Sequence, residues 1–247
     1  MSHKYRFIAD FSTEQDEKNS WFIRSEELRH LKKVLRLKVG DAVEVFDGCG
    51  NFGDGVIVSI DEAVAQVLVK EPKFLDFPSS PLYVVMGALK SGGVDDLLPP
   101  LVELGADHIH VFLQKNNEKV RIHEKVQKRW ERIICSSSKQ SKRAWLPAVH
   151  AWHGLGHCLD FIDGCIFANA NKFVFLPESS ANVLQVTLQD GANVAVFGGE
   201  KGFDSDELSL LACRRFLDVS LGVNILRATT AVVVGSALLA LRGNLRE

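Results

Sequence analysis

The stretch that decides the fold is Val194-Ala-Val-Phe-Gly198-Gly199-Glu200-Lys201-Gly202-Phe203-Asp204-Ser205-Asp206-Glu207-Leu208. Its apolar start predicts a buried strand, and its end predicts a helix with Ser205 as the N-cap. Between them lie three glycines with an acid among them. Glycines at the carboxyl end of a strand let the backbone approach a ligand closely. A tight turn alone would need one or two glycines, so the pattern predicts a ligand site.

A second loop follows the next predicted strand. It reads Asp218-Val-Ser-Leu221-Gly222-Val-Asn-Ile225-Leu226-Arg227-Ala-Thr229-Thr230-Ala231. Its apolar side chains are suited to clasping a flat ring, and Arg227 stands just before a long apolar helix. A buried arginine would need a partner. From the residues alone, Arg227 is equally compatible with a structural ion pair and with a functional role.

The region around these two loops alternates between strands and helices. Apolar strands are predicted at residues 82–89, 108–113, 173–176, 193–197 and 216–221. Helices are predicted at residues 95–104, 123–137, 205–214 and 229–242. This alternation is typical of a parallel sheet with helices on both faces, so the predicted fold class is α/β.

The amino-terminal part has a different pattern. Strands at 42–46 and 56–60, joined by a glycine-rich turn, predict a hairpin, and 63–70 predicts a further strand. A helix over 25–35, capped by Ser25, completes a small β-rich barrel. The Pro/Ser-rich stretch 71–81 is the best linker candidate.

Charge gives a weak indication of a nucleic-acid partner. The net charge is -2, but residues 115–143 hold ten Lys or Arg against three acids, a local excess of +7. Residues 24–38 hold six against two, an excess of +4. Such stripes can contact phosphates, although a solvated helix face explains them equally well.

Cysteine and histidine spacing gives no metal site. The five cysteines contain no C-x-x-C pair and read as reduced, mostly buried thiols. His150, His153 and His157 with Cys158 have helical spacing, but Gly154 and Gly156 disfavour the helix that would align them, so no metal is expected. The start of the chain shows no signal peptide and no apolar run is long enough to cross a membrane, so a cytoplasmic protein is expected.

At the two loops the sequence resembles the SPOUT methyltransferase superfamily, and more closely the family that methylates N3 of a uridine in 16S ribosomal RNA. The family's G-P-E-G-G-F segment appears as Gly198-Gly-Glu200-Lys-Gly202-Phe203. Its S-L-G-x-x-I-L-R-x-E-T-A segment appears as Ser220-Leu-Gly222-Val-Asn-Ile225-Leu226-Arg227-Ala-Thr-Thr230-Ala231. Further matches in the family's order are His30-Leu-Lys-Lys-Val-Leu35-Arg36-Leu-Lys-Val-Gly40-Asp41, Phe46-Asp47-Gly48, Glu103-Leu104-Gly105, Gln140-Ser141-Lys-Arg143 with Pro147, and Phe175-Leu-Pro-Glu178.

The resemblance implies an architecture and a cofactor. Residues 1–72 would form a PUA-like RNA-binding β-barrel, and residues 73–247 a SPOUT α/β domain with a C-terminal trefoil knot. The cofactor would be S-adenosylmethionine. Its implied binding residues are Leu176, Glu178, Gly198, Gly199, Glu200, Gly202, Leu217, Leu221, Gly222, Ile225 and Leu226.

The resemblance also implies partners and roles. The substrate would be small-subunit ribosomal RNA, and the protein would act as a homodimer. Loss of the uracil N3 proton spreads negative charge over the adjacent carbonyl oxygens, which a fixed cation or donor stabilises. Arg227, Arg143 and Gln140 are the candidates for this catalytic role. Contacts with RNA are expected from Arg6, Arg24, Lys33 and Arg36, and the base that removes the proton is not identified.

Four positions depart from the family pattern. Gly199 stands where the family has Pro, Lys201 where it has Gly, Thr229 where it has Glu, and Pro100 where it has Lys. Thr229 removes the acid expected beside Arg227. The favoured hypothesis is therefore a diverged but active methyltransferase. The alternatives are action on another RNA, or an RNA-binding homologue with weakened or lost catalysis.

Overall fold

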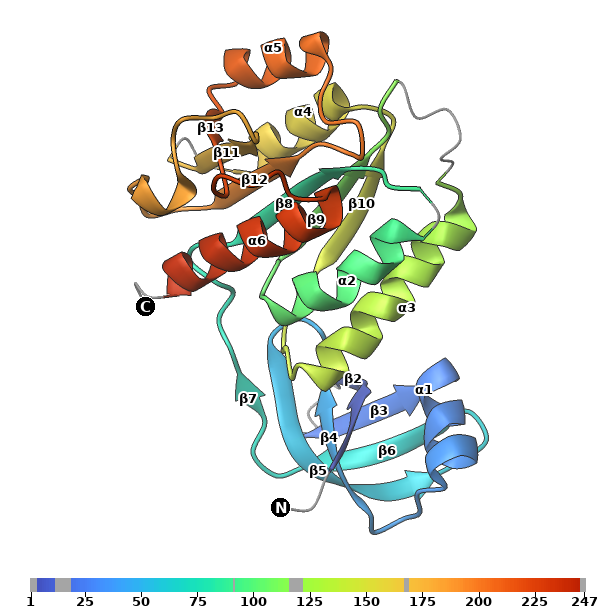
Figure 1. The fold of residues 1–247 in the computed structure, drawn as a ribbon. Helices are drawn as coiled ribbons and strands as arrows, with labels where there is room; N and C mark the ends of the chain where they lie inside the picture. The colour runs from blue at the N-terminus through green and yellow to red at the C-terminus, as the bar shows by residue number, and fades with distance from the viewer. Residues whose placement is uncertain (1–3, 12–18, 91, 116–121, 167–168, 245–247) are drawn as a thin grey trace. The chain divides into compact units, whose positions relative to one another are not determined.

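The computed structural model describes residues 4–11, 19–90, 92–115, 122–166 and 169–244, and it divides into two compact units (Figure 1). Unit 1 contains Met1–Phe77 and Cys135–Leu146, and unit 2 contains Pro78–Ile134 and Pro147–Glu247. The domain boundary expected between residues 72 and 73 stays a prediction.

Unit 1 is built on a seven-stranded sheet of order β1-β4-β5-β6-β3-β2, with β7 beside β5. The strands are β1 (Tyr5–Ile8), β2 (Asp10–Phe11), β3 (Ser20–Arg24), β4 (Ala42–Phe46), β5 (Asn51–Ile60), β6 (Val64–Val69) and β7 (Lys73–Phe74). Only β1 and β4 pair in parallel among the described strands of this sheet. A core that includes Phe7, Trp21 and Ile57 lies against it.

The predicted hairpin is present as β4 and β5, but its second strand starts five residues earlier than expected, at Asn51 rather than residue 56. Gly53 and Gly55 belong to this strand and not to the turn. A Cβ on either glycine would lie 2.5 Å from a methyl carbon of Val69 or Val67 on β6. These glycines are therefore explained by close packing within the sheet. The expected linker also differs, because β7 within it pairs with β5.

The predicted helix over 25–35 is divided in two: α1 (Ser25–Arg29) continues into a π-helical turn, η2 (His30–Leu35). Ser25 is not the N-cap. Arg24 holds that position, and Ser25 has a left-handed φ of 50°. The cap prediction was wrong because the strand β3 runs directly into the helix and leaves no residue for a separate cap.

Unit 2 is built on a six-stranded sheet in which every pairing is parallel, as predicted. Its order is β10-β9-β8-β12-β11-β13, with β8 (Leu82–Gly87), β9 (His108–Phe112), β10 (Ala148–Trp152), β11 (Asn171–Phe175), β12 (Asn193–Phe197) and β13 (Leu217–Val219). The chain proceeds outward from β8 in one direction, and β12, β11 and β13 occupy the other side. Ligands of such sheets bind at the carboxyl ends of the strands, near the point where the order reverses.

Helices cover both faces of this sheet, as predicted (Figure 1). α2 (Gly93–Glu103) and α6 (Ala228–Asn244) pack on one face, and α4 (Leu155–Cys165) and α5 (Ser205–Cys213) on the other. α3 (Glu124–Gln140) and the short 3-10 helix η3 (Val183–Gln185) complete the elements. β10 and α4 were not predicted. The two glycines argued against one continuous helix through His150, His153 and His157, and none forms, because His150 lies on β10 and α4 begins only after Gly154.

Residues 181–186, which include η3, are held by two later parts of the chain. The backbone N–H of Ser220 donates to the carbonyl of Ala181 at 2.8 Å. The guanidinium of Arg242, near the end of α6, donates to the carbonyl oxygens of Val183 and Val186. Residues 181–186 are therefore fixed both to the strand β13 region and to the last helix.

Two further observations concern the chain as a whole. No described helix is long and apolar enough to span a bilayer. All five cysteines are free thiols, but only Cys158 is buried, whereas Cys49, Cys165 and Cys213 are exposed. The expectation of mostly buried cysteines was therefore wrong.

Candidate functional site

A cavity of about 530 Å³ lies at the carboxyl ends of β11, β12 and β13. Their last residues, Phe175, Phe197 and Val219, contribute to its lining. Most of the remaining lining comes from three segments that follow these strands: residues 176–178, residues 198–203, and residues 221–228 except Val223. The cavity is thus at the carboxyl ends of parallel strands, where such sheets bind ligands, and it includes β12, one of the two strands between which the order reverses.

Every predicted cofactor-binding residue except Leu217 lines this cavity, and Arg227 lines it too. Leu217 is the first residue of β13, so it lies at the amino end of the strand, whereas the cavity lies at the carboxyl end. Its side chain is exposed. The geometry therefore brings together the two glycine-containing loops that the sequence singled out, and it leaves Leu217 outside.

Residues Gly198–Gly202, here called the glycine loop, make a tight reversal after β12. The N–H of Gly202 donates to the carbonyl of Gly199 at 3.0 Å, and Gly202 has a left-handed φ of 71°. A Cβ on Gly198 would lie 2.8 Å from the carbonyl carbon of Gly202. Because real Cβ atoms do not approach so closely, glycine is required at 198 for the loop to close.

The helix after the glycine loop, α5, begins with a capping box. The N-cap is Asp204, not the predicted Ser205. The Asp204 carboxylate accepts from the N–H of Glu207 at 2.8 Å, and the Glu207 carboxylate accepts from the N–H of Asp204 at 3.0 Å. Both residue types cap helices well, but only Asp204 has a glutamate three residues later, Glu207, so the capping-box spacing in the sequence favours Asp204 over Ser205.

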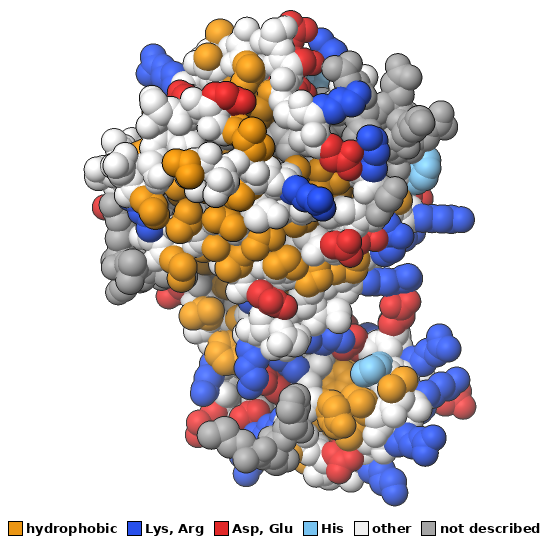
Figure 2. All heavy atoms as spheres, viewed as in Figure 1, with side chains coloured by type: hydrophobic (Ala, Val, Ile, Leu, Met, Phe, Trp, Pro, Cys, Tyr) orange, Lys and Arg blue, Asp and Glu red, His pale blue; other side chains and the backbone are white. Residues whose placement is uncertain are grey.

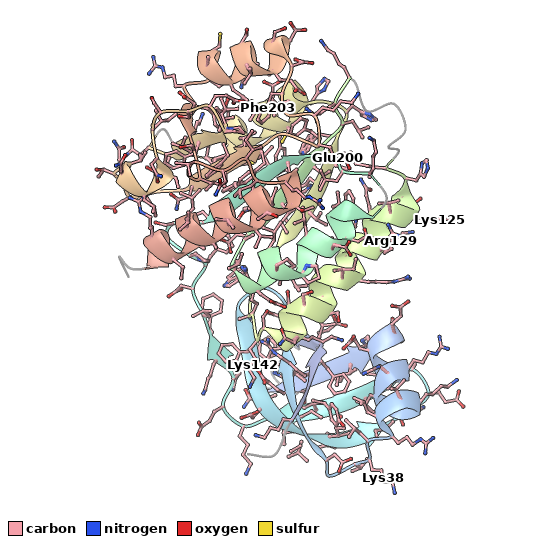
Figure 3. All side chains as sticks on the ribbon, viewed as in Figure 1. Lys38, Lys125, Arg129, Lys142, Glu200 and Phe203 are labelled. Atoms are coloured by element: carbon pink, nitrogen blue, oxygen red, sulfur yellow. The ribbon has the colours of Figure 1, made fainter. Side chains whose placement is uncertain are left out.

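Glu200, in the middle of the glycine loop (Figure 3), forms an ion pair with Lys90, which follows β8. The Lys90 Nζ lies 3.1 Å from a carboxylate oxygen of Glu200, and both side chains are about half exposed. The hydrogen bond from Lys90 lowers the pKa of Glu200. Glu200 therefore stays negatively charged at the rim of the cavity around neutral pH.

Apolar side chains form part of the cavity wall. The Phe175 and Phe197 rings stack with centroids 4.5 Å apart. Gly235 of α6 lies against Phe197, where a Cβ would come within 2.7 Å of the ring. In the second loop, Ile225 is 81% exposed.

Arg227 stands at the edge of the cavity, directly before α6. Its side chain is exposed, and its carbonyl accepts the first helical hydrogen bond, from the N–H of Ala231 at 2.9 Å. No acid within ion-pair distance of Arg227 is found in the described part of the chain. The structural ion pair that the sequence left open is therefore not seen, and Thr229 supplies no substitute charge.

The other two predicted catalytic residues belong to unit 1. Gln140 is the exposed last residue of α3, and the N–H of Arg143 donates to the carbonyl of Ser138 at 3.0 Å. Neither lines the cavity.

The four predicted RNA contacts differ in exposure. Arg24, Lys33 and Arg36 are exposed, and Arg24 pairs with Asp10 at 3.2 Å. The Arg6 side chain is only 5% exposed, pairs with Glu44 at 3.1 Å and lies over the Phe46 ring at 4.2 Å. This burial speaks against a phosphate contact by Arg6.

Two residues beside the glycine loop were missed by sequence reasoning: Lys90 and Gln114, which follow β8 and β9. Both stand at carboxyl ends of strands that were predicted, and the carboxyl ends of parallel strands share one edge of a sheet. That signal could have found them. No group of three or more His, Cys, Asp or Glu side chains that could hold a metal ion is found among the described residues.

Comparison with known proteins relates both units to RNA methyltransferases. A family model described as an RNA methyltransferase domain matches residues 76–240, and an RNA methyltransferase PUA domain model matches residues 23–68. A Synechocystis protein named ribosomal RNA small subunit methyltransferase E is 29% identical over 240 residues, covering 94% of this chain and 76% of that protein. A Buchnera aphidicola protein of the same name is 27% identical over 223 residues, covering 87% of this chain and 86% of that protein.

Solved structures show the same fold. The Neisseria gonorrhoeae ribosomal RNA small subunit methyltransferase E, crystallised with S-adenosyl methionine, superposes with a TM-score of 0.83 at 23% identity, covering 97% of this chain and 98% of that one. A Legionella pneumophila methyltransferase in complex with the same cofactor gives a TM-score of 0.82 at 19% identity, with coverage of 97% and 98%.

Proposed function

Because the chain belongs to the RNA methyltransferase family, whose domain model spans residues 76–240, we propose that it transfers a methyl group from S-adenosylmethionine to N3 of a uridine in 16S ribosomal RNA. The observation that carries this proposal is the cavity at the glycine loop with the exposed Arg227 at its edge. Relatives named ribosomal RNA small subunit methyltransferase E support the choice of RNA.

The cavity fits S-adenosylmethionine in size and chemistry. Its volume of about 530 Å³ falls within the range of small-molecule sites, roughly 300–1,000 Å³. Leu176, Leu221 and Leu226 offer apolar surface for an adenine ring. The glycine loop lets backbone groups approach the bound cofactor closely. Glu178 and Glu200 place carboxylates at the rim for the cofactor's positively charged amino group. When bound, the cofactor would supply a methyl carbon on a positively charged sulfur.

The protein's own part in the reaction is to position the uracil and to stabilise charge. As N3 loses its proton, negative charge develops on the two flanking carbonyl oxygens. The Arg227 guanidinium, which has no acidic partner among the described residues, is free to donate to one of them. We assign Gln140 and Arg143 of unit 1 to the same charge-stabilising role and Arg24, Lys33 and Arg36 to phosphates.

We also propose the finer architecture that the family implies. Unit 1 is assigned as a PUA-like barrel and the end of the chain as a trefoil knot. The bonds from Ser220 and Arg242 to residues 181–186 support the threading, because one short segment is held by two later ones. A crystallographic trace of residues 171–244 tests it: a chain end that passes beside the 176–192 loop rather than through it would rule out the knot.

A homodimer is part of the same proposal. α6 carries apolar side chains around its whole circumference, and Figure 2 shows apolar side chains gathered over this helix. Leu241 on it is 61% exposed. A helix that is apolar on all sides is normally covered, and a second copy would cover the exposed part. Since ribosomal RNA is the proposed substrate, we place the protein in the cytoplasm.

The function is tested by mapping modified nucleosides. Ribosomal RNA from a strain lacking the gene should lose 3-methyluridine, and re-expression of the protein should restore it. An unchanged level of 3-methyluridine with loss of another methylated nucleoside would reassign the target. No change at any nucleoside, combined with RNA binding by the purified protein, would support the RNA-binding homologue without catalysis.

A further inference from the structure

Gln114 lies just after β9, and its side-chain amide makes three hydrogen bonds at the glycine loop. Its Oε1 accepts from the backbone N–H of Gly199 at 3.1 Å. Its Nε2 donates to the carbonyl of Gly202 at 2.8 Å and to the carboxylate of Glu207 at 2.9 Å. Both hydrogens of the amide nitrogen are therefore used, together with one lone pair of the oxygen.

The packing around this amide leaves no room for another carbon. A Cβ on Gly199 would lie 2.4 Å from the Gln114 Oε1. A Cβ on Gly87, the last residue of β8, would lie 2.8 Å from the same oxygen and 2.5 Å from the Gly199 nitrogen. The end of β8, the Gln114 amide and the glycine loop are thus in direct contact.

The third hydrogen bond extends this cluster to α5. The Glu207 carboxylate oxygen that accepts from Gln114 also accepts from the N–H of Asp204, within the capping box. Gln114 therefore connects the end of β9 with both sides of the glycine loop and with the first turn of the helix that follows it.

We propose that Gln114 is a positioning residue that holds the glycine loop in the shape that receives S-adenosylmethionine, an inference that rests on the proposed function. Glycine loses more conformational freedom on ordering than any other residue, so a loop with three glycines is costly to fix when the ligand arrives. Hydrogen bonds already made in the free protein remove part of that cost from binding. Gln114 does not line the 530 Å³ cavity, so it acts through the loop.

The chemistry of the amide explains why glutamine occupies this position. The loop presents one donor, the Gly199 N–H, and one acceptor, the Gly202 carbonyl, and a side-chain amide satisfies both. A glutamate of the same shape would keep the acceptor but lose both donors. It would also face the Glu207 carboxylate with a second negative charge.

The test compares four variants by calorimetric titration with S-adenosylmethionine. Gln114→Ala should raise the Kd about tenfold, equivalent to about 1.4 kcal/mol. Gln114→Glu should raise it at least as much. Gly199→Ala should weaken binding in the wild-type background, because the new Cβ displaces the amide. In the Gln114→Ala background it should add little further loss, since the obstructing oxygen is gone.

Two further measurements separate positioning from general stability. The steady-state KM for the cofactor should rise in Gln114→Ala while kcat at saturating cofactor stays within about twofold. Gln185→Ala is the matched control, because Gln185 is an exposed glutamine of the same unit outside the cavity, and its Kd should not change.

The outcomes distinguish the inference from the function on which it rests. A wild-type protein with no saturable binding of S-adenosylmethionine would overturn the proposed function. Wild-type binding that is matched by both Gln114 variants would overturn the role of Gln114 and leave the function intact. Losses in Gln114→Ala and Gly199→Ala that simply add would also overturn it, because the two groups would then act independently.

Discussion

At the residue scale, Arg227 has an exposed guanidinium at the edge of the cavity and no acid beside it among the described residues. Arg227→Ala should lower the rate of methyl transfer by about 100-fold or more, the usual loss when a donor to a developing oxyanion is removed. The Kd for S-adenosylmethionine should stay within about tenfold. Single-turnover assays with ribosomal RNA and calorimetry measure the two quantities.

Arg227→Lys provides the conservative comparison. An ammonium keeps the charge but not the planar set of donors, so this variant should retain part of the rate. Unchanged turnover in Arg227→Ala would remove the residue from the mechanism.

His110 gives a second prediction at this scale. It is fully buried on β9, its Nδ1 accepts from the Trp152 Nε1 at 3.1 Å, and its Nε2 has no hydrogen-bond partner among the described residues. The rings of His108 and His150 stack with the His110 ring, with centroid distances of 6.2 and 5.2 Å. Burial, with these two neighbours adding to it, lowers the pKa of His110 to about 3.

The sign of the resulting pH dependence follows from this depressed pKa. Below about pH 6.5 the unfolded chain takes up a proton on this histidine, whereas the folded protein does not until about pH 3. The free energy of unfolding should therefore fall as pH is lowered from 6.5, by at most about 1.4 kcal/mol per pH unit for this residue. His110→Phe should flatten this slope in urea titrations at pH 7, 6 and 5. Parallel curves for variant and wild type would contradict the prediction.

The residues of the cavity were largely predictable because they follow strands directly. Apolar runs mark the strands, and the glycines after them mark the loops, so Gly198 and Leu226 could be named without coordinates. Leu217 was included through the family resemblance, and in the structure it lies at the amino end of β13, outside the cavity. Gln114 was missed because its importance comes from contacts with Gly199 and Gly202, which are 85 and 88 residues away.

At the element scale, the structure shows which of two neighbouring residues caps α5, and it is not the one named from the sequence. Asp204 makes the capping hydrogen bond, whereas Ser205 is the first helical residue and its side chain caps nothing. Asp204→Ala should cost about 1 kcal/mol, or about 2–4 °C in Tm for a chain of this size. Ser205→Ala should change Tm by less than 1 °C, and differential scanning calorimetry of the two variants checks this. Equal losses in both would contradict the assignment of the cap.

Elements were predicted well where their period was strong and poorly where local geometry was unusual. The apolar runs of β8 and β12 have every residue buried and were found. The π-helical turn η2 was read as ordinary helix, because both conformations place apolar residues on one face over so short a span. α4 was missed because Gly154 and Gly156 reduce helix propensity, which burial of Leu155, Leu159 and Ile162 overcomes.

At the scale of the whole molecule, the exposed apolar surface of α6 predicts association. Leu241→Glu would place a charge in the proposed contact between copies and should shift the mass in analytical ultracentrifugation from twice 27.4 kDa to 27.4 kDa. Val34→Glu is the matched control, because Val34 is 64% exposed in unit 1 and its substitution should leave the mass unchanged. A wild-type monomer would remove the dimer from the proposal.

The division into a β-rich part and an α/β part was visible in the sequence, but the membership of residues 135–146 was not. They belong to unit 1 through contacts such as Lys139 with Glu27 and Arg6 with the Ser138 carbonyl, which join residues 112 and 132 apart. Periodicity reports local structure only, so neither these contacts nor the path of the last helix could be derived from it.

The glycine loop has a consequence for how the gene can vary. Its shape is set by peptide groups, by the absence of a Cβ at residues 87, 198 and 199, and by the side-chain amide of Gln114. The Lys201 side chain is exposed and takes part in none of these constraints. A methyl group at Gly87 or Gly198 should therefore be removed by selection, whereas the charge at 201 should vary freely among relatives. Inherited diversity at this site should collect on the rim and spare the backbone beneath it.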